Sequence, residues 1–312
     1  MPAFAGTFYV RPDGNNSNSG TANTPQGAWA TIQKAADTVN PSDLVEVQPG
    51  TYNEQVTITR SGLANQLITF HGAGGAIDGQ NTRPYCIKLD GADYIRIDGF
   101  TVRNATDNGI LLDNSADSNI ILWNNCYNNG ASGIRLTNTS NYNIVAVNTC
   151  YSNGAGTSAY GDRPCGIYVF NSSNYNTLAD NTCRNNTSTG IWLEGSSSYC
   201  TVKNNKTYSN GWGGIIVAGG TNYNAVSYNL IYSNGAMGVD LSYSAHDNVF
   251  TNNTIYNNGS NGIQSNNTGY SNVLKNNIIV NNGLNNSYAA GISIEAGSSA
   301  VSTYNDVYNN GQ

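Results

Sequence analysis

The stretch "NNGASGIRLTNTSNYNIVAVNTCYSNG", residues 128–154, opens with Asn-Asn-Gly and closes with Ser-Asn-Gly. In its middle, Gly-Ile-x-Leu alternates apolar and variable positions. A Gly followed by Ile or Val starts the same phrase at Gly109, Gly133, Gly166, Gly190, Gly214, Gly238, Gly262 and Gly291. Five of the seven spacings are 24 residues, and the others are 33 and 29. A fixed period of this size is typical of repeat architectures, in which each repeat stacks on its neighbours.

Two asparagine columns follow the same period. The first contains Asn124, Asn148, Asn181, Asn205, Asn229, Asn253, Asn277 and Asn305. The second contains Asn129, Asn153, Asn186, Asn210, Asn234, Asn258, Asn282 and Asn310. Three independent columns with the same 24-residue period indicate a solenoid.

The alternation inside each repeat predicts short strands, because a period of two is the pattern of a half-buried strand. Two further columns are apolar and are expected to point inward; they begin at Ile121 and at Cys126. Three strands per repeat with bends between them predict an all-β protein, a three-sided parallel β-helix of about 24 residues per coil. Its coils would stack about 4.8 Å apart.

The asparagines and glycines are expected at the bends. Asn bonds local backbone there, tolerates the left-handed region, and forms amide ladders when identical side chains stack. The glycines at 130, 154, 211, 235, 259 and 283 would relieve a positive φ.

The N-terminal part is less regular. Residues 29–39, "WATIQKAADTV", place Ile32, Ala35, Ala36 and Val39 on one helical face. We expect a short helix that covers the first open ladder. The chain is thus predicted to be one domain, 1–312, with an N-terminal strand and capping helix in 1–45 and coils in 46–312.

Composition excludes several classes of partner. The net charge is −6 and the 13 Lys and Arg are scattered, whereas a nucleic-acid partner needs a basic stripe. No apolar run approaches the length of about 20 residues that spans a membrane. We expect neither nucleic-acid binding nor membrane insertion, and either a monomer or a module of a larger protein.

The outward positions of the Gly-Ile strands form two columns. The first contains Leu111, Arg135, Tyr168, Trp192, Ile216, Asp240, Gln264 and Ser293. The second contains Asp113, Thr137, Phe170, Glu194, Ala218, Ser242, Asn266 and Glu295. Exposed aromatic rings beside a few charges are suited to sugar rings, so Phe170 and Trp192 are candidate substrate-binding residues.

The two longer spacings point to the same face. Their extra residues lie in 154–165 and 284–290, just before a Gly-Ile strand, and loops on a repeat scaffold tend to border the binding side. Asp162 and Arg163, in the longer loop, are therefore further substrate-binding candidates. The alternative is that the loops are neutral insertions and the aromatic residues an outer packing patch.

Other conspicuous residues have structural explanations. A tyrosine column (Tyr127, Tyr151, Tyr208, Tyr232, Tyr256, Tyr308) is expected to stack outward on another face. The six cysteines lack metal-ligand spacing and are expected to be buried thiols, although a Cys150–Cys183 disulfide is geometrically allowed. His71 and His246 are isolated and are expected to be structural.

The stretch "FYVRPDGNNSNSGT…WATIQKAADTVNPSDLVEVQPGTYNEQVTI" resembles the opening of secreted bacterial right-handed parallel β-helix proteins of the pectate-lyase-like superfamily. The Asn-rich repeats resemble the repeat segments of that superfamily. The resemblance implies a right-handed helix and a secreted or cell-surface protein that acts on a polysaccharide. The aspartate, lysine and arginine motifs of its pectate lyases are not recognisable here.

The resemblance makes polysaccharide β-elimination the leading reaction. It requires a base beside a uronate carboxylate and a positive group to neutralise that carboxylate. Arg135 is the candidate neutralising group and Tyr168 the candidate proton-transfer group. No cofactor is certain, but a Ca²⁺ held by Asp113 or Asp162 would assist.

Two alternatives remain open. One is a noncatalytic carbohydrate-binding or cell-surface structural solenoid. The other is an inverting glycoside hydrolase that uses Glu194 and Asp240, two coils apart and thus about 9–10 Å between backbones. Inverting enzymes hold their carboxyl groups ~6.5–9.5 Å apart, and apolar neighbours such as Ile216 and Ala218 would raise the pKa of one of them.

Overall fold

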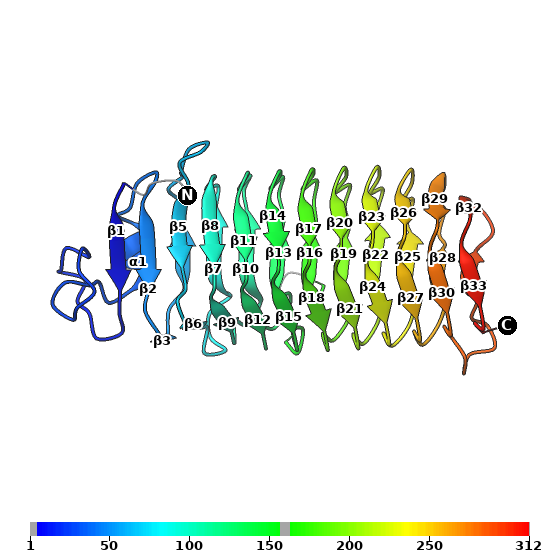
Figure 1. Ribbon diagram of the computed structural model, residues 1–312, viewed down its shortest axis with the longest axis horizontal. Coiled ribbons are helices and arrows are strands. Elements are labelled where there is room, and N and C mark those ends of the chain that lie inside the picture. Colours follow the sequence, from blue (N-terminus) through cyan, green and yellow to red (C-terminus); the bar gives the residue numbers. More distant parts are fainter. Residues whose placement is uncertain (1–4, 157–162, 312) are drawn as a thin grey trace.

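The computed structural model describes residues 5–156 and 163–311 and shows a right-handed parallel β-helix. Its coils stack along one long axis, so the strands of successive coils lie side by side (Figure 1). They form three parallel sheets, A, B and C, and a regular coil runs from sheet B through sheet C to sheet A. The predicted fold class is therefore confirmed.

Sheet A has twelve strands in the described residues. They are β1 (Thr7–Val10), β2 (Leu44–Val47), β5 (Ile68–His71), β8 (Ile95–Asp98), β11 (Ile120–Leu122), β14 (Ile144–Ala146), β17 (Thr177–Ala179), β20 (Thr201–Lys203), β23 (Ala225–Ser227), β26 (Val249–Thr251), β29 (Asn272–Lys275) and β32 (Ala300–Thr303). Its inward column is completely buried from Ile121 to Leu274, as the sequence predicts.

Sheet B has eleven strands in the same described ranges. They are β3 (Gly50–Tyr52), β6 (Gly75–Asp78), β9 (Thr101–Arg103), β12 (Asn125–Tyr127), β15 (Thr149–Tyr151), β18 (Thr182–Arg184), β21 (Lys206–Tyr208), β24 (Leu230–Tyr232), β27 (Thr254–Tyr256), β30 (Ile278–Val280) and β33 (Asp306–Tyr308). Cys126, Cys150 and Cys183 are paired in register across three of these strands and buried.

Sheet C has ten strands within the part of the chain that the structure describes. They are β4 (Val56–Ile58), β7 (Tyr85–Asp90), β10 (Asn108–Asp113), β13 (Ile134–Leu136), β16 (Ile167–Val169), β19 (Ile191–Leu193), β22 (Ile215–Ala218), β25 (Val239–Ser242), β28 (Ile263–Ser265) and β31 (Ile292–Ile294). Every Gly-Ile phrase forms one of these strands.

The asparagine columns form hydrogen-bonded ladders through the buried corners. Asn205 is representative: its Oδ1 accepts the backbone N–H of Asn181 at 2.9 Å and the Nδ2 of Asn181 at 3.0 Å. Asn205 donates the same two bonds to Asn229, and its Nδ2 also donates to the carbonyl of Leu178 at 2.9 Å. Since each amide satisfies backbone that leaves the sheets, the asparagines are structural.

A third ladder lies at the corner between sheets C and A. It is not one of the two asparagine columns predicted from the sequence. It contains Asn119, Asn143, Asn176, Asn224, Asn248 and Asn272. Cys200 occupies the position between Asn176 and Asn224 and interrupts the amide series.

The glycine explanation was wrong at four of the six positions. Only Gly154 and Gly283 have a positive φ, of 96° and 63°; at most corners the residue before the ladder Asn takes that conformation, as Asn204 does at 56°. A Cβ on Gly130 would lie 2.0 Å from the carbonyl oxygen of Thr106 in the preceding coil. Glycine is needed there because the two backbones approach too closely for a side chain.

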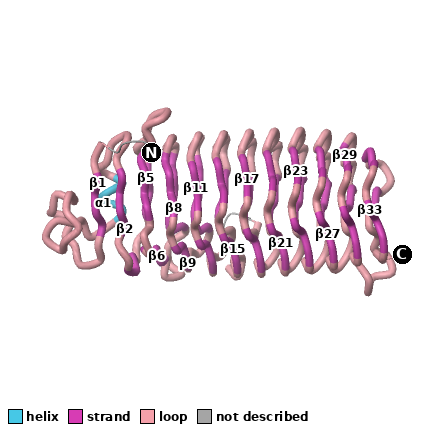
Figure 2. The backbone as a smooth tube through the Cα atoms, in the orientation of Figure 1, coloured by secondary structure: helices cyan, strands magenta, loops and turns pink. Residues whose placement is uncertain are grey.

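The described residues contain one helix, α1 (Ile32–Ala36), which is shorter than the segment 29–39. Figure 2 shows it as the cyan segment near β1 and β2. It lies against β4, the edge strand of sheet C. The Gln33 side chain donates to the Thr57 carbonyl at 2.9 Å and accepts its N–H at 2.7 Å, as a neighbouring strand would.

Candidate functional site

The outer face of sheet C contains both predicted outward columns. Strand pairing places Arg135 beside Tyr168, Tyr168 beside Trp192, and Trp192 beside Ile216 on consecutive coils. Asp240 then pairs with Ile216 on one side and Gln264 on the other. The parallel register thus aligns side chains that are distant in the sequence along one line.

Part of this face is screened from solvent although its side chains point out of the solenoid. Tyr168 is 3% exposed, Ile216 1% and Asp240 8%. On sheet A, by contrast, Ile144 remains 42% exposed at an outward position. Burial of these side chains lowers the local dielectric and strengthens the electrostatic interactions made there.

Arginine and aromatic side chains pack together at the middle of the face. The Arg135 guanidinium lies 5.4 Å from the centre of the Tyr168 ring and 5.8 Å from that of Phe170. The Tyr168 ring stacks on Phe170 at 5.4 Å and meets the edge of Trp192 at 6.4 Å. Arg163, which follows the undescribed part of the longer loop, lies over Trp192 at 4.5 Å. We call Arg135, Arg163, Tyr168, Phe170, Trp192 and Glu194 the arginine–aromatic cluster.

Glu194 joins the two halves of the cluster. Its Oε2 accepts the Tyr168 hydroxyl at 2.8 Å. The Arg163 guanidinium donates to Oε1 at 3.3 Å and to Oε2 at 3.4 Å. A phenol, a carboxylate and a guanidinium are therefore in direct contact, with a second guanidinium behind the phenol.

Burial sets the protonation states in the cluster. Desolvation, reinforced by the charge and hydrogen bond of Glu194, raises the pKa of Tyr168, so the phenol keeps its proton. Desolvation lowers the pKa of the Arg135 guanidinium, which is largely buried. Desolvation also acts on Arg163, but its bond to Glu194 outweighs this and raises the pKa. The cluster thus combines a neutral acid with cations.

Asp240 lies on the same face, two coils beyond Trp192. Its Oδ2 accepts the Ser242 hydroxyl at 3.1 Å. Desolvation raises the pKa of Asp240 to about 6, Ser242 partly offsets this, and the charge of Glu295 adds to it. Ile216 pairs with Asp240 and Ala218 pairs with Ser242, and both are buried. This agrees with the expectation that apolar neighbours raise one carboxyl pKa on this face.

Asp113, the candidate calcium ligand, lies on the face at β10. It accepts Lys88 Nζ at 2.9 Å and Asn138 Nδ2 at 2.7 Å, and Lys88 also binds Asp90 at 3.2 Å. Burial acts to raise the pKa of Asp113, but these bonds outweigh it and lower the pKa.

As they lie, these residues do not fit a calcium ion, because the carboxylate oxygens are already bound to an ammonium and an amide. Among the described residues no group of three or more His, Cys, Asp or Glu could hold a metal. Asp162, the other candidate ligand and a predicted substrate contact, lies outside the described residues.

Sequence reasoning missed two features of this region. Lys88 and Asp90 extend the outward columns by one coil, but β7 lacks the Gly-Ile phrase that located the other strands. Four exposed tyrosines also stack on the coils that carry the cluster, at the corner toward sheet A: Tyr142, Tyr175, Tyr199 and Tyr223. The sequence contains a signal for these tyrosines, because each lies nine residues after the glycine of its coil: Gly133, Gly166, Gly190 or Gly214.

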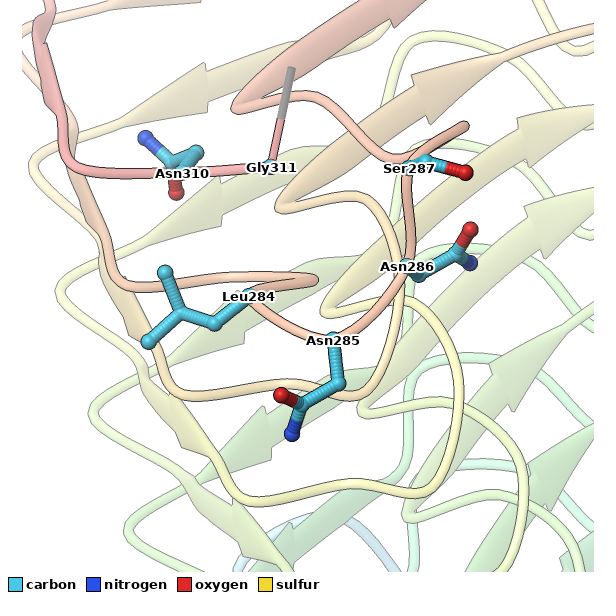
Figure 3. Close-up of a pocket in the computed structure, with 6 residues that line it drawn as sticks. All are labelled: Leu284, Asn285, Asn286, Ser287, Asn310 and Gly311. Carbon is cyan, nitrogen blue, oxygen red and sulfur yellow. The ribbon is translucent and has the colours of Figure 1, made fainter.

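A pocket of about 440 Å³ lies elsewhere, at the second insertion. It is lined by Leu284, Asn285, Asn286, Ser287, Asn310 and Gly311, and Figure 3 shows their side chains. None of these is titratable, so this pocket offers no acid or base, and the outer face of sheet C is the better candidate site.

The remaining predicted structural residues are engaged locally. His71 binds Asp98, and His246 binds Asp247 at 2.8 Å and stacks on Tyr270 at 4.6 Å. The six cysteines are free and buried. In the predicted tyrosine column, Tyr208 and Tyr232 stack at 4.8 Å, and Arg184 lies over Tyr151 at 4.4 Å.

The fold and the polar, aromatic outer face define a parallel β-helix with a candidate site on one sheet. The chain belongs to the Pel9A-like, right handed beta helix region family, whose model matches residues 8–305. No curated protein matches the sequence.

Several solved structures are similar. An alginate lyase from Paenibacillus sp. str. FPU-7 is 19% identical over 88% of this chain and 96% of its own, with a TM-score of 0.71. The pectate lyase Pel9A is 19% identical over 98% of this chain and 80% of its own, at 0.62. A lacto-N-biosidase from Eubacterium ramulus is 12% identical over 97% of this chain and 68% of its own, at 0.70.

These likenesses establish the fold.

The described part of the chain has no helix with the length and apolar content of a membrane span.

Proposed function

We propose that this protein is a secreted or cell-surface lyase that cleaves an acidic polysaccharide by β-elimination on the outer face of sheet C. The observation that carries this proposal is the Tyr168 hydroxyl held at 2.8 Å on Glu194, with Arg163 on that carboxylate and Arg135 against the Tyr168 ring. Membership of the Pel9A-like family supports it, as does the structural similarity to an alginate lyase and a pectate lyase.

The guanidinium groups bind the uronate. Arg163 is partly exposed and holds Glu194 only at 3.3 Å, so an incoming carboxylate competes with Glu194 for it. Arg135 adds a second positive charge from behind the Tyr168 ring. Neutralising the carboxylate stabilises the charge that develops on it when the adjacent C–H bond breaks. Trp192 and Phe170 contribute ring surface for the sugar C–H groups.

The elimination step balances with two protein groups. Glu194, released from Arg163, takes the proton from C5; the C–H electrons form the C4=C5 double bond, and the bond from C4 to the glycosidic oxygen breaks. Tyr168, whose raised pKa keeps it protonated, donates its proton to that oxygen. The Tyr168–Glu194 hydrogen bond then returns the proton from the carboxyl to the phenolate.

The test is an assay for unsaturated uronate products on alginate, polygalacturonate and mixed uronate polymers. We expect Tyr168→Phe and Arg135→Ala each to lower kcat/KM by about a hundredfold or more, as for loss of a general acid or of a charge-stabilising donor. Tyr208→Phe, in the stacked column of sheet B, is the matched control and should retain full activity. Full activity in Tyr168→Phe would exclude the proposed acid.

The noncatalytic alternative predicts binding without products. We expect Trp192→Ala to weaken oligosaccharide binding about tenfold through lost ring contact. A wild-type protein that binds glycans in a Trp192-dependent manner and never releases product would be a binding module.

The burial of Asp240 favours an inverting hydrolase as a second candidate, because it raises the pKa of this carboxyl to about 6, as a general acid requires. Glu194 would then be the base that activates water. This candidate predicts new reducing ends without unsaturated products, and their loss in Glu194→Gln. Unsaturated products from the wild type would reject it.

A further inference from the structure

Asp240 has a feature that the proposed elimination does not use. It stands in an outward column, between Ile216 and Gln264, yet it is 8% exposed. One carboxylate oxygen, Oδ2, accepts the Ser242 hydroxyl. The other, Oδ1, is buried and has no hydrogen-bond partner in the described part of the protein.

An orphaned buried carboxylate oxygen is costly for the fold. A buried acceptor without a donor costs about 1–3 kcal/mol, and more when it is charged. Such a group persists in a native structure when something other than stability maintains it, and a bound ligand that supplies the missing donor is one such reason. The unpartnered oxygen lies on the face that carries the cluster, in line with Trp192 and Tyr168.

The charges on this face are divided along the axis. Lys88, Arg135 and Arg163 all belong to coils on the N-terminal side of Trp192. From β22 onward the two outward columns contain no Lys or Arg: Ile216, Ala218, Asp240, Ser242, Gln264, Asn266, Ser293 and Glu295. In the N-terminal half the cations are accompanied by Asp90, Asp113 and Glu194. In the other half a sugar meets only acids, amides, hydroxyls and apolar side chains.

We propose that Asp240 forms a subsite for a neutral sugar and rejects a uronate at that position. Resting on the proposed function, this makes the substrate a heteropolysaccharide, with a uronate at the arginine–aromatic cluster and a neutral sugar two coils further along. Because Oδ1 has almost no exposed surface in the unliganded structure, the side chains around it move aside when a sugar binds, and a sugar hydroxyl then donates to Oδ1 and completes its hydrogen bonding. A uronate carboxylate has no proton to donate at neutral pH and places a second negative charge beside a desolvated one.

The selectivity follows because a buried polar group that has a hydrogen-bond partner in the complex is much lower in free energy than one left without a partner. A site built to bond a hydroxyl discriminates strongly against an analogue that leaves the site unpaired, and like charges add repulsion. Ile216 and Ala218 offer no cation to relieve that repulsion, and the Ser242 hydroxyl already bonds Oδ2. Specificity is thereby assigned to Asp240 as a positioning residue, while the elimination stays at Tyr168 and Glu194.

The experiment compares two sets of oligosaccharides at pH 7.5: homo-oligomers of uronate, and oligomers that alternate uronate with neutral sugar. Wild type, Asp240→Asn and the control Asp306→Asn are measured for kcat/KM by product formation and for Kd by calorimetry. Asp306 lies exposed on sheet B and gives the same change of charge. Thermal unfolding of each variant reports folding.

We expect the wild type to prefer the alternating oligomers by at least about tenfold, and Asp240→Asn to lose most of that preference by gaining on homo-oligomers. Asp306→Asn should keep the wild-type ratio. An unchanged ratio in folded Asp240→Asn, or a wild type that prefers homo-oligomers, would overturn the subsite.

The two proposals fail separately. Binding with an Asp240-dependent preference but no product would refute the lyase and leave the subsite standing. Product formation with a ratio indifferent to Asp240 would refute the subsite alone. Absence of both binding and product would refute both.

Discussion

Thr207 occupies the inward column of sheet B between Cys183 and Ile231, in register with both. Its hydroxyl is completely buried, and its Oγ1 has no hydrogen-bond partner in the described residues. The neighbouring positions of this column are filled by thiols and aliphatic side chains of similar size. The position therefore accepts the shape of a β-branched residue but gains nothing from the oxygen.

Thr207→Val should stabilise the protein by about 1–2 kcal/mol, because it removes an unsatisfied buried hydroxyl without changing the shape of the side chain. The free energy of unfolding in urea measures the effect. Thr182→Val, at a partly exposed position of β18, serves as the control and should change stability by less than about 0.5 kcal/mol. A destabilised Thr207→Val would show that the hydroxyl has a partner in solution.

Asp240 makes stability depend on pH. Its pKa is raised to about 6, whereas an unfolded aspartate titrates near 3.9. Between these values the native state holds a proton that the unfolded state has lost, so stability falls as the pH rises through this window. The loss approaches about 3 kcal/mol above pH 6, at 1.36 kcal/mol per pKa unit.

Asp240→Asn removes this pH-dependent loss of stability. We expect the variant to be more stable than the wild type at pH 7.5, and the difference to shrink steadily as the pH falls from about 6 to 4. Thermal unfolding across that range tests the sign. A difference that is constant with pH would mean that Asp240 titrates normally in the folded protein.

At the scale of elements, the ladders fix how one coil sits on the next. Cys200 is the weak point of the corner between sheets C and A, because its thiol stands where every neighbouring coil has an amide. Its Sγ makes only long contacts, 3.7 Å to the Ser173 carbonyl and 3.6 Å to that of Ser198. The backbone N–H of Cys200 still donates to Asn224 Oδ1 at 2.7 Å, so the geometry of the ladder is intact.

Cys200→Asn should therefore stabilise the protein by about 1 kcal/mol, since the new amide oxygen accepts both donors of Asn176 and its nitrogen reaches Asn224. Asn205→Ala is the complementary variant. It leaves both donors of Asn181 unpaired in the core and should cost several kcal/mol. Urea unfolding of the pair is the measurement; equal stability of both variants and the wild type would deny the ladder an energetic role.

The strands and loops also show which contacts can be predicted from the sequence and which cannot. The columns headed by Asn124, Asn129 and Gly133 could be found because each coil repeats them at one spacing, and a parallel register turns equal spacing into contact. The contact of Arg163 with Glu194 could not be found, because Arg163 lies in an insertion that no other coil shares. The burial of Asp240 could not be predicted either, because strand alternation assigns it an outward position and says nothing of how closely neighbouring side chains cover it.

At the scale of the whole molecule, stability resembles a sum over coils and their interfaces. Deletion of residues 245–268 removes one complete coil and joins Ser244 to Gly269. Ser244 and Thr268 have matching φ values of 64° and 67°, so the junction keeps the local backbone. The deletion retains the cluster and Asp240.

This variant should fold, bind the same oligosaccharides, and unfold with an m-value lowered by about a tenth, in proportion to the surface lost. Deletion of residues 245–256 is the control: half a coil rotates the following strands onto the wrong sheets and should prevent folding. Circular dichroism and urea titration distinguish the two. A folded half-coil deletion would contradict the register described above.

The asparagine ladders have an evolutionary consequence. In the two ladders that begin at Asn124 and Asn129, each coil presents the same donors and acceptors to its successor. A duplicated 24-residue segment of the gene therefore joins on both sides without any compensating mutation in them. A duplication between Glu194 and Asp240 would move these two residues one further rung apart, by about 4.8 Å, and change neither of them. A single duplication can thus lengthen the distance between Glu194 and Asp240 by one coil, and with it the length of sugar chain that spans the two residues.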